Sequence, residues 1–72
     1  MLSFSIKESG RSIQIYCDKE GVLALVAALE EVRDAGSHTH LLAPSRGGQV
    51  LSDKTPWGEA AVSEVIVSFG GD

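Results

Sequence analysis

Two histidines, His38 and His40, are the residues whose type and spacing first suggest chemistry. They stand two apart in a segment typical of a β-strand, and residues i and i+2 of a strand point to the same face. Two imidazoles so placed can chelate one zinc ion or a similar metal. A metal site normally needs a third ligand, and no such residue stands beside them at a diagnostic spacing. The alternative is a pair of half-exposed strand residues that hydrogen-bond to a neighbour.

A cysteine nucleophile is the second chemical candidate, with Cys17 as the thiolate and His40 as the base. Cys17 ends an apolar alternation and precedes Asp18, whose negative charge disfavours a thiolate. We therefore expect Cys17 in the core and no catalytic residue. Gly47 and Gly48 lack the lysine and the following helix of a phosphate-binding loop, so they predict a turn. No cofactor is expected.

Length and composition favour binding over catalysis. The chain has 72 residues, of which 43% are hydrophobic and 22% are charged, which predicts one folded domain over residues 1–72. A chain this short has few residues left to build a deep pocket once its core is filled. We therefore expect a protein that is not an enzyme.

Charge and cysteine usage restrict the partners and the compartment. Ten acidic against six basic residues give a net charge of −4, without the clustered Lys and Arg that nucleic-acid binding requires. A basic protein is the better electrostatic match. The single cysteine cannot form an internal disulfide, and the longest apolar run, residues 22–29, is too short to cross a bilayer. These features predict a cytoplasmic protein with neither nucleic acid nor membrane as partner.

Apolar periodicity predicts an N-terminal hairpin followed by a helix. Residues 2–7 and 12–17 alternate with a period of two, around a turn that contains Gly10. Asp18 suits a helix N-cap and Gly36 a left-handed stop, so the helix is predicted over residues 19–35. Its apolar stripe, expected to lie against the sheet, is Val22, Leu25, Val26, Leu29 and Val32.

The C-terminal half predicts further strands. Residues 38–43 form a strand that Pro44 ends, and residues 49–52 form a short strand that completes a second hairpin. A loop or a single helical turn follows over residues 53–58, and residues 63–69 form the last strand. The predicted fold is α+β, in the order ββαβββ: a single antiparallel sheet of four to five strands with one helix packed on one face.

The uncovered face of that sheet is the first candidate contact surface. In the predicted register it carries Gln14, Tyr16, His38 and His40, together with Ser12. Trp57, the only tryptophan, is expected to cover the edge of the core, or otherwise to anchor a partner. Glu30, Glu31 and Asp34 at the helix end predict a solvated acidic face, or alternatively a patch for a basic partner.

Three segments carry a resemblance to a known family: His38-Thr-His40-Leu41, the Gly47-Gly48 turn that runs on to Leu51-Ser52, and the closing strand. On these segments the chain resembles the immunity proteins of bacterial polymorphic toxin systems, in the family numbered thirty-two. The resemblance implies a non-enzymatic protein that binds a cognate toxin and neutralises it in the producing cell. His38, His40, Gly47, Gly48 and Leu51 match the family pattern, but no role follows for them from the match.

Three functions remain as hypotheses. The first is an immunity-type protein that occludes a toxin through the open sheet face near His40 or through the acidic helix end. The second is a small metal-binding or sensor domain that uses His38 and His40. The third is a structural homodimer that buries the open sheet face, and it is compatible with either of the others.

Overall fold

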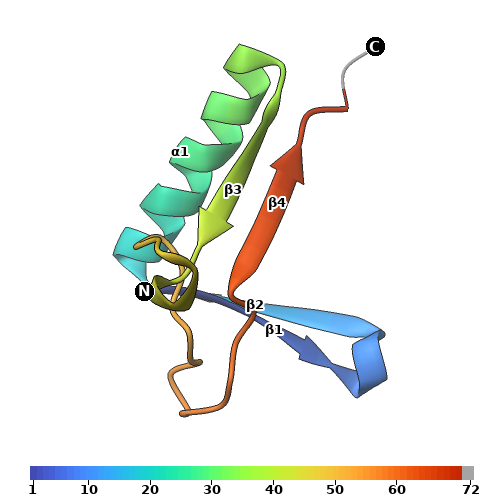
Figure 1. Cartoon of the computed structure of the whole chain (residues 1–72), viewed down its shortest axis with the longest axis vertical. Coiled ribbons are helices and arrows are strands. Elements are labelled where there is room, and N and C mark those ends of the chain that lie inside the picture. The colour runs from blue at the N-terminus through green and yellow to red at the C-terminus, as the bar shows by residue number, and fades with distance from the viewer. Residues whose placement is uncertain (71–72) are drawn as a thin grey trace.

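The computed structural model describes residues 1–70 and has an α+β fold (Figure 1). Along the chain lie strand β1 (Leu2–Lys7), the 3-10 turn η1 (Glu8–Gly10), β2 (Ser12–Cys17), helix α1 (Lys19–Ala35), β3 (His38–Leu42), the 3-10 turn η2 (Pro44–Arg46) and β4 (Glu64–Ser68). The strands form two separate two-stranded sheets, β1–β2 and β3–β4. The α+β class is confirmed, and the prediction of a single sheet of four to five strands is wrong.

The N-terminal hairpin forms as the sequence predicts. Strands β1 and β2 pair antiparallel, from Leu2 opposite Cys17 to Lys7 opposite Ser12. The connecting turn holds Glu8, Ser9 and Gly10 at φ of 53°, 54° and 89°. A positive φ strains any residue except glycine, which explains why Gly10 stands at the position with the largest positive φ.

The helix begins and ends where its caps predict. The Asp18 carboxylate accepts a hydrogen bond of 2.8 Å from the Gly21 N–H, and its Oδ1 also lies 2.5 Å from the ammonium group of Met1. At the other end Gly36 is left-handed, at φ 63°, and its N–H donates to the carbonyl of Val32. The N-cap therefore also holds the start of β1 against the start of the helix.

The predicted apolar stripe of α1 is confirmed at Val32, which is buried, and at Leu25, which packs against the core, but it is wrong at its other three residues. The buried helix residues are Gly21, Ala28 and Val32, whereas Val22 and Leu29 are about half exposed, as is Val26. The reason is the close approach at Gly21, where a Cβ atom would lie 2.0 Å from the carbonyl oxygen of Met1. Small side chains thus set the contact face of the helix, and the larger ones are turned outward.

The second hairpin is also a wrong prediction. Strand β3 pairs with β4, from His38 opposite Ser68 to Leu42 opposite Glu64, and residues 49–52 are not a strand. The N–H groups of Val50 and Leu51 both donate to the one carbonyl of Leu42, at 3.2 and 3.1 Å. Two successive donors on one acceptor do not continue a β-ladder, in which donors alternate in direction.

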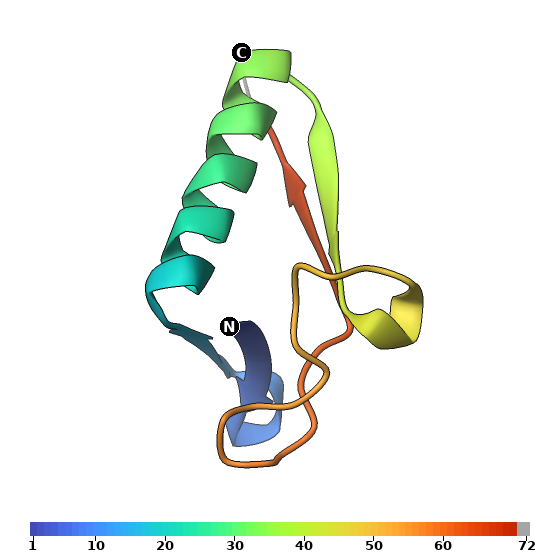
Figure 2. The same cartoon turned by 90° about the vertical axis from the view of Figure 1, so that its left-hand side faces the viewer.

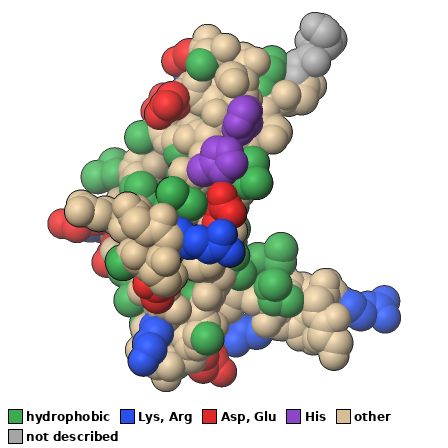
Figure 3. Space-filling model, in the orientation of Figure 1, with side chains coloured by type: hydrophobic (Ala, Val, Ile, Leu, Met, Phe, Trp, Pro, Cys, Tyr) green, Lys and Arg blue, Asp and Glu red, His purple; other side chains and the backbone are tan. Residues whose placement is uncertain are grey.

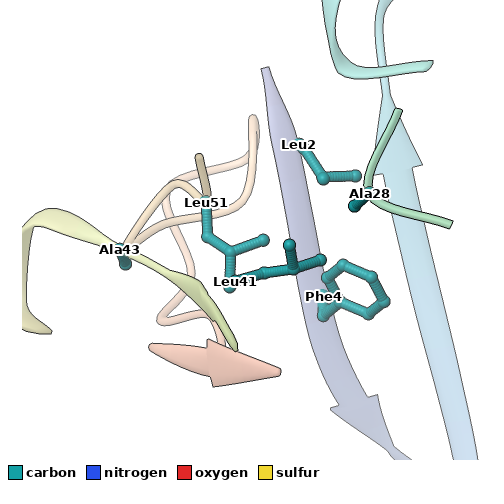
Figure 4. Close-up of a cluster of buried hydrophobic side chains, with 6 residues drawn as sticks. All are labelled: Leu2, Phe4, Ala28, Leu41, Ala43 and Leu51. Carbon is teal, nitrogen blue, oxygen red and sulfur yellow. The ribbon is translucent and has the colours of Figure 1, made fainter. Parts of the chain in front are cut away.

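The core lies where the hairpin, the helix and β3 converge. It consists of Leu2, Phe4, Ala28, Leu41, Ala43 and Leu51 (Figure 4). The outer edge of β1 is covered too, because residues 52 and 62 donate backbone hydrogen bonds to the carbonyls of Leu2 and Phe4, each at 2.8 Å. Ser3 and Ser5 on the polar face of β1 are also buried. Figure 2 shows this connecting segment wrapping around the hairpin.

The far half of the hairpin extends beyond the core. Ile13 and Ile15 share a face with Phe4, as the sequence predicts, but Ile13 is 66% exposed and Ile15 is about half exposed. Figure 1 shows the reason, since β1 and β2 project away from the layer formed by α1, β3 and β4. Only the end of the hairpin next to the helix is therefore covered.

Candidate binding surface

One face of the β3–β4 sheet packs toward the helix and the other is open. Leu41 of β3 is buried, and Val65 and Val67 of β4 pack against the core. Residues i and i+2 and cross-strand partners share a face, so the open face carries the other residues of both strands. From β3 and β4 respectively, these are His38, His40, Leu42, Glu64, Ile66 and Ser68.

The centre of this face is a polar group built from three elements. His40 Nδ1 lies 2.9 Å from Glu64 Oε2, and Arg46 Nη1 lies 3.6 Å from Glu64 Oε1. Arg46 Nε also donates to Ser63 Oγ at 3.2 Å. Glu64 therefore holds an imidazole and a guanidinium on either side of its carboxylate, and all three side chains remain partly exposed. We call His40, Glu64 and Arg46 the polar cluster.

Local backbone geometry places Arg46 in that cluster. Arg46 ends η2, which begins at Pro44, and Gly47 follows in the left-handed conformation at φ 81°. Ser45 holds the same turn from the other side, because both its N–H and its hydroxyl donate to the Asp53 carboxylate. The Gly47-Gly48 turn of the sequence is thus confirmed, and it positions a cation above the sheet.

The two histidines share the open face as their spacing predicts. Their ring centroids lie 5.2 Å apart at an interplanar angle of 69°, edge to face. Figure 3 shows both rings side by side on the surface, with acidic and basic side chains next to them. A neutral His40 that donates from Nδ1 to Glu64 has Nε2 as its acceptor. The pair can therefore offer a hydrogen-bond acceptor to a docking molecule.

A metal site would require a third ligand. Within residues 1–70 no group of three or more His, Cys, Asp or Glu side chains is placed to hold a metal ion. The Glu64 carboxylate is instead engaged by His40 and Arg46.

The residues predicted to share a face with the histidines lie elsewhere. Gln14 and Tyr16 belong to the β1–β2 sheet, so the single surface predicted for them and the histidines is wrong. Tyr16 packs against Trp57, with ring centroids 5.8 Å apart at an interplanar angle of 75°. Trp57 is 62% exposed, and it packs on the hairpin and is not part of the core cluster. The pair packs edge to face where the loop that carries Trp57 meets the hairpin.

The acidic helix end is exposed, as expected of a solvated face. Glu30, Glu31 and Asp34 all face solvent, and Arg33 Nε lies 2.9 Å from Asp34 Oδ1. This hydrogen bond lowers the pKa of Asp34 and raises the pKa of Arg33. Arg33 thereby offsets part of the negative charge. Cys17 lies half-buried against the core, in agreement with its predicted packing role.

No family model, curated protein or solved structure matches the chain. The residues themselves therefore carry the functional argument. None of the helices within residues 1–70 has the length and apolar character needed to cross a membrane.

Sequence reasoning did not place Glu64 and Arg46 beside His40. The signal for Glu64 was present, because Glu64 and Ile66 alternate with the inward-facing Val65 and Val67 of the last strand. The sequence could not show that Glu64 lies beside His40, since the alternation within one strand does not identify the strand that pairs with it. Arg46 lies in a turn, where no periodicity predicts the direction of a side chain.

Proposed function

We propose that this chain is a non-enzymatic binding protein of the immunity type, which neutralises a cognate bacterial toxin by occluding it in the cytoplasm of the producing cell. The contact surface in this proposal is the open face of the β3–β4 sheet. The observation that carries the proposal is the polar cluster, which is held in place by its own contacts and yet remains accessible.

Fixed side chains favour binding because little freedom is lost when a partner docks. Ordering a flexible side chain at an interface costs about 0.5–1.5 kcal/mol, and the contacts among His40, Glu64 and Arg46 already supply part of that order. Ile66 stands beside His40 on the same face and is 55% exposed. Specific protein interfaces combine apolar contact area with hydrogen-bonding groups, and Ile66 beside the polar cluster supplies the apolar part.

The charge of the chain agrees with a basic partner. The net charge is −4, and Glu64 on the open face supplies an acceptor for a Lys or Arg of the partner. Complementary charge raises association rates and excludes wrong partners. Toxins that cleave nucleic acids need a basic cleft for the phosphate backbone, which an acidic inhibitor can fill.

The test is protection by single-site variants. Cells would express the toxin domain encoded directly upstream of this gene together with wild-type chain or with His40→Ala or Gln14→Ala. We expect the wild-type chain and Gln14→Ala to protect, and His40→Ala to bind the toxin about 10-fold to 100-fold more weakly, as for a central interface residue. Gln14 is the matched control because it is an exposed polar strand residue on the other sheet.

Thermal unfolding of each variant separates contact from folding. His40 is exposed, so its loss should leave the unfolding temperature nearly unchanged. Equal protection by His40→Ala and wild type would refute this contact surface, and absence of any toxin gene beside this one would count against the immunity function. Isothermal titration with zinc tests the alternative metal function, because tight zinc binding that His38→Ala abolishes would replace the immunity proposal.

A further inference from the structure

An apolar notch lies between the projecting hairpin and β4, beside the open sheet face, with which it shares Glu64. Its volume is about 410 Å³, and its lining includes Ile6, Ile13 and Ile15 from the hairpin and Val62, Glu64 and Val65 from the chain that enters β4. The space-filling view in Figure 3 shows hydrophobic side chains at this re-entrant angle. Glu64 is the charged residue of the lining.

Among residues 1–70, the outer edges of β2 and β4 carry backbone groups that no other strand pairs with. The N–H of Val62 donates to the carbonyl of Phe4, so the backbone groups of Phe4 and of its partner Ile15 point out of the β1–β2 ladder. On the outer edge of β2 this leaves Ile13 and Ile15 with unpaired backbone groups. In β4 the carbonyl of Ser63 accepts a hydrogen bond from the Ala43 N–H, so the backbone groups of Ser63 point toward β3. Because this direction alternates along a strand, the backbone groups of Glu64 and Ile66 point to the outer edge of β4.

Within residues 1–70 these two edges carry few of the features that normally prevent edge-to-edge pairing. Such edges are protected by charged side chains, proline, bulges or a covering segment. Strand β2 reads Ser-Ile-Gln-Ile-Tyr-Cys, without a charge or a proline, and β4 has one charge at its first residue. Both are regular and contain β-branched residues, which favours pairing with another strand.

The exposed area also exceeds that of a compact monomer. The accessible surface is 4974 Å², whereas a folded monomer of this mass exposes about 4300 Å². The excess of about 700 Å² is close to the roughly 800 Å² that each partner contributes to a standard protein interface. The radius of gyration, 12.4 Å, is likewise larger than the value of about 11 Å expected for this length.

A second copy of the chain fits the notch better than an unrelated partner, because the chain carries the complementary shape itself. The notch requires a narrow apolar projection, and the hairpin that forms one of its walls is such a projection. The hairpin also carries Arg11 beside its turn, which is opposite in charge to Glu64 in the notch. One two-fold axis would place each hairpin in the other copy's notch and satisfy both strand edges at once.

We propose that two copies form a two-fold dimer in which the hairpin of each lies in the apolar notch of the other, with the outer edge of β2 beside the outer edge of β4. Glu64 lies at the boundary of the two surfaces, but His38, His40 and Ile66 on the open face of the β3–β4 sheet lie outside the lining of the notch, so the dimer leaves them accessible to a toxin. It differs from the homodimer that would bury that face.

The molar mass in solution tests this assembly. Sedimentation equilibrium of the full chain at micromolar concentrations should give twice the monomer mass of 7.6 kDa. Ile13→Lys should raise the dimer dissociation constant at least about 10-fold, because it places a charge in the apolar contact. Leu23→Lys is the matched control, since Leu23 is 69% exposed on the helix and lies outside the notch. A monomeric wild type, or equal weakening by both variants, would overturn the proposal.

Amide hydrogen exchange gives a second measurement that does not depend on a variant. In the dimer the N–H groups of Ile13 and Ile15 become hydrogen-bonded, so their exchange should slow as the protein concentration rises. Fast exchange of both amides at a concentration where the protein is dimeric would assign the dimer to another surface and overturn this assembly. His40→Ala should leave the dimer mass unchanged. A lower mass for this variant would mean that the dimer interface includes the proposed toxin contact, and would overturn the proposal that the two surfaces differ.

Discussion

Gly48 packs so closely on β3 that a single methyl group there should destabilise the turn that carries Arg46. A Cβ atom on Gly48 would lie 2.4 Å from the Cβ of Leu42 and 2.6 Å from its carbonyl oxygen. One of those atoms belongs to the backbone, so the clash cannot be relieved by rotating a side chain. The Gly48 N–H also donates to the carbonyl of Ala43 at 3.0 Å. Gly48→Ala must therefore displace the turn from the end of the strand.

The expected cost combines two effects. Overpacking a tight site costs about 1–3 kcal/mol, and weakening the Gly48 hydrogen bond adds about 1 kcal/mol. A total of about 2–4 kcal/mol corresponds to a fall of about 10–25 °C in the unfolding temperature of a domain of this size. Circular dichroism during thermal and urea unfolding measures both quantities.

Gly47→Ala is the matched control for this variant. Gly47 has φ +81°, and a Cβ atom there would have no neighbour within 4 Å. Its substitution should therefore cost only the strain of the left-handed conformation, about 1–2 kcal/mol. If Gly48→Ala is no more destabilising than Gly47→Ala, the close approach of Gly48 to Leu42 is not what fixes the turn, and the steric reasoning fails.

Two further predictions concern the core and the helix cap. Leu41→Ala should cost about 2–5 kcal/mol in urea unfolding, because Leu41 is 3% exposed; Ile66→Ala, on the open face of the adjacent strand, should cost much less, and equal losses would contradict the assigned faces. The ammonium of Met1 and the helix N-terminus lower the pKa of Asp18 below its ordinary value of 3.8, so the stability gained from its charge is complete above that pH and is lost as the pH falls through the folded pKa. Asp18→Asn keeps a capping side chain but removes this titration, so the unfolding temperature of the variant should fall less steeply on acidification than that of the wild type, and parallel curves would contradict the assignment.

Local sequence determined the elements that depend on neighbours along the chain. The hairpin over β1 and β2 follows from two alternating runs around a glycine that tolerates positive φ. The limits of α1 follow from Asp18 and Gly36, whose capping roles need only the adjacent turn of helix. The shared face of His38 and His40 follows from the period of a strand.

Tertiary packing decided how those elements meet. Alternation in residues 38–42 predicts a strand but not its partner, and the partner is β4, more than twenty residues further along the chain. Helical periodicity gave the apolar side of α1 only approximately, because the close approach at Gly21 turned Val22 and Leu29 outward.

The candidate sites divide in the same way. The histidines could be selected from the sequence, but Glu64 and Arg46 join His40 only after β4 pairs with β3 and the glycine turn folds over the strand end. The apolar notch likewise has no local signal, since it exists only because the hairpin extends past the core. Spacing along a chain fixes which side chains share a face, whereas the distance between two faces depends on packing that only the whole fold provides.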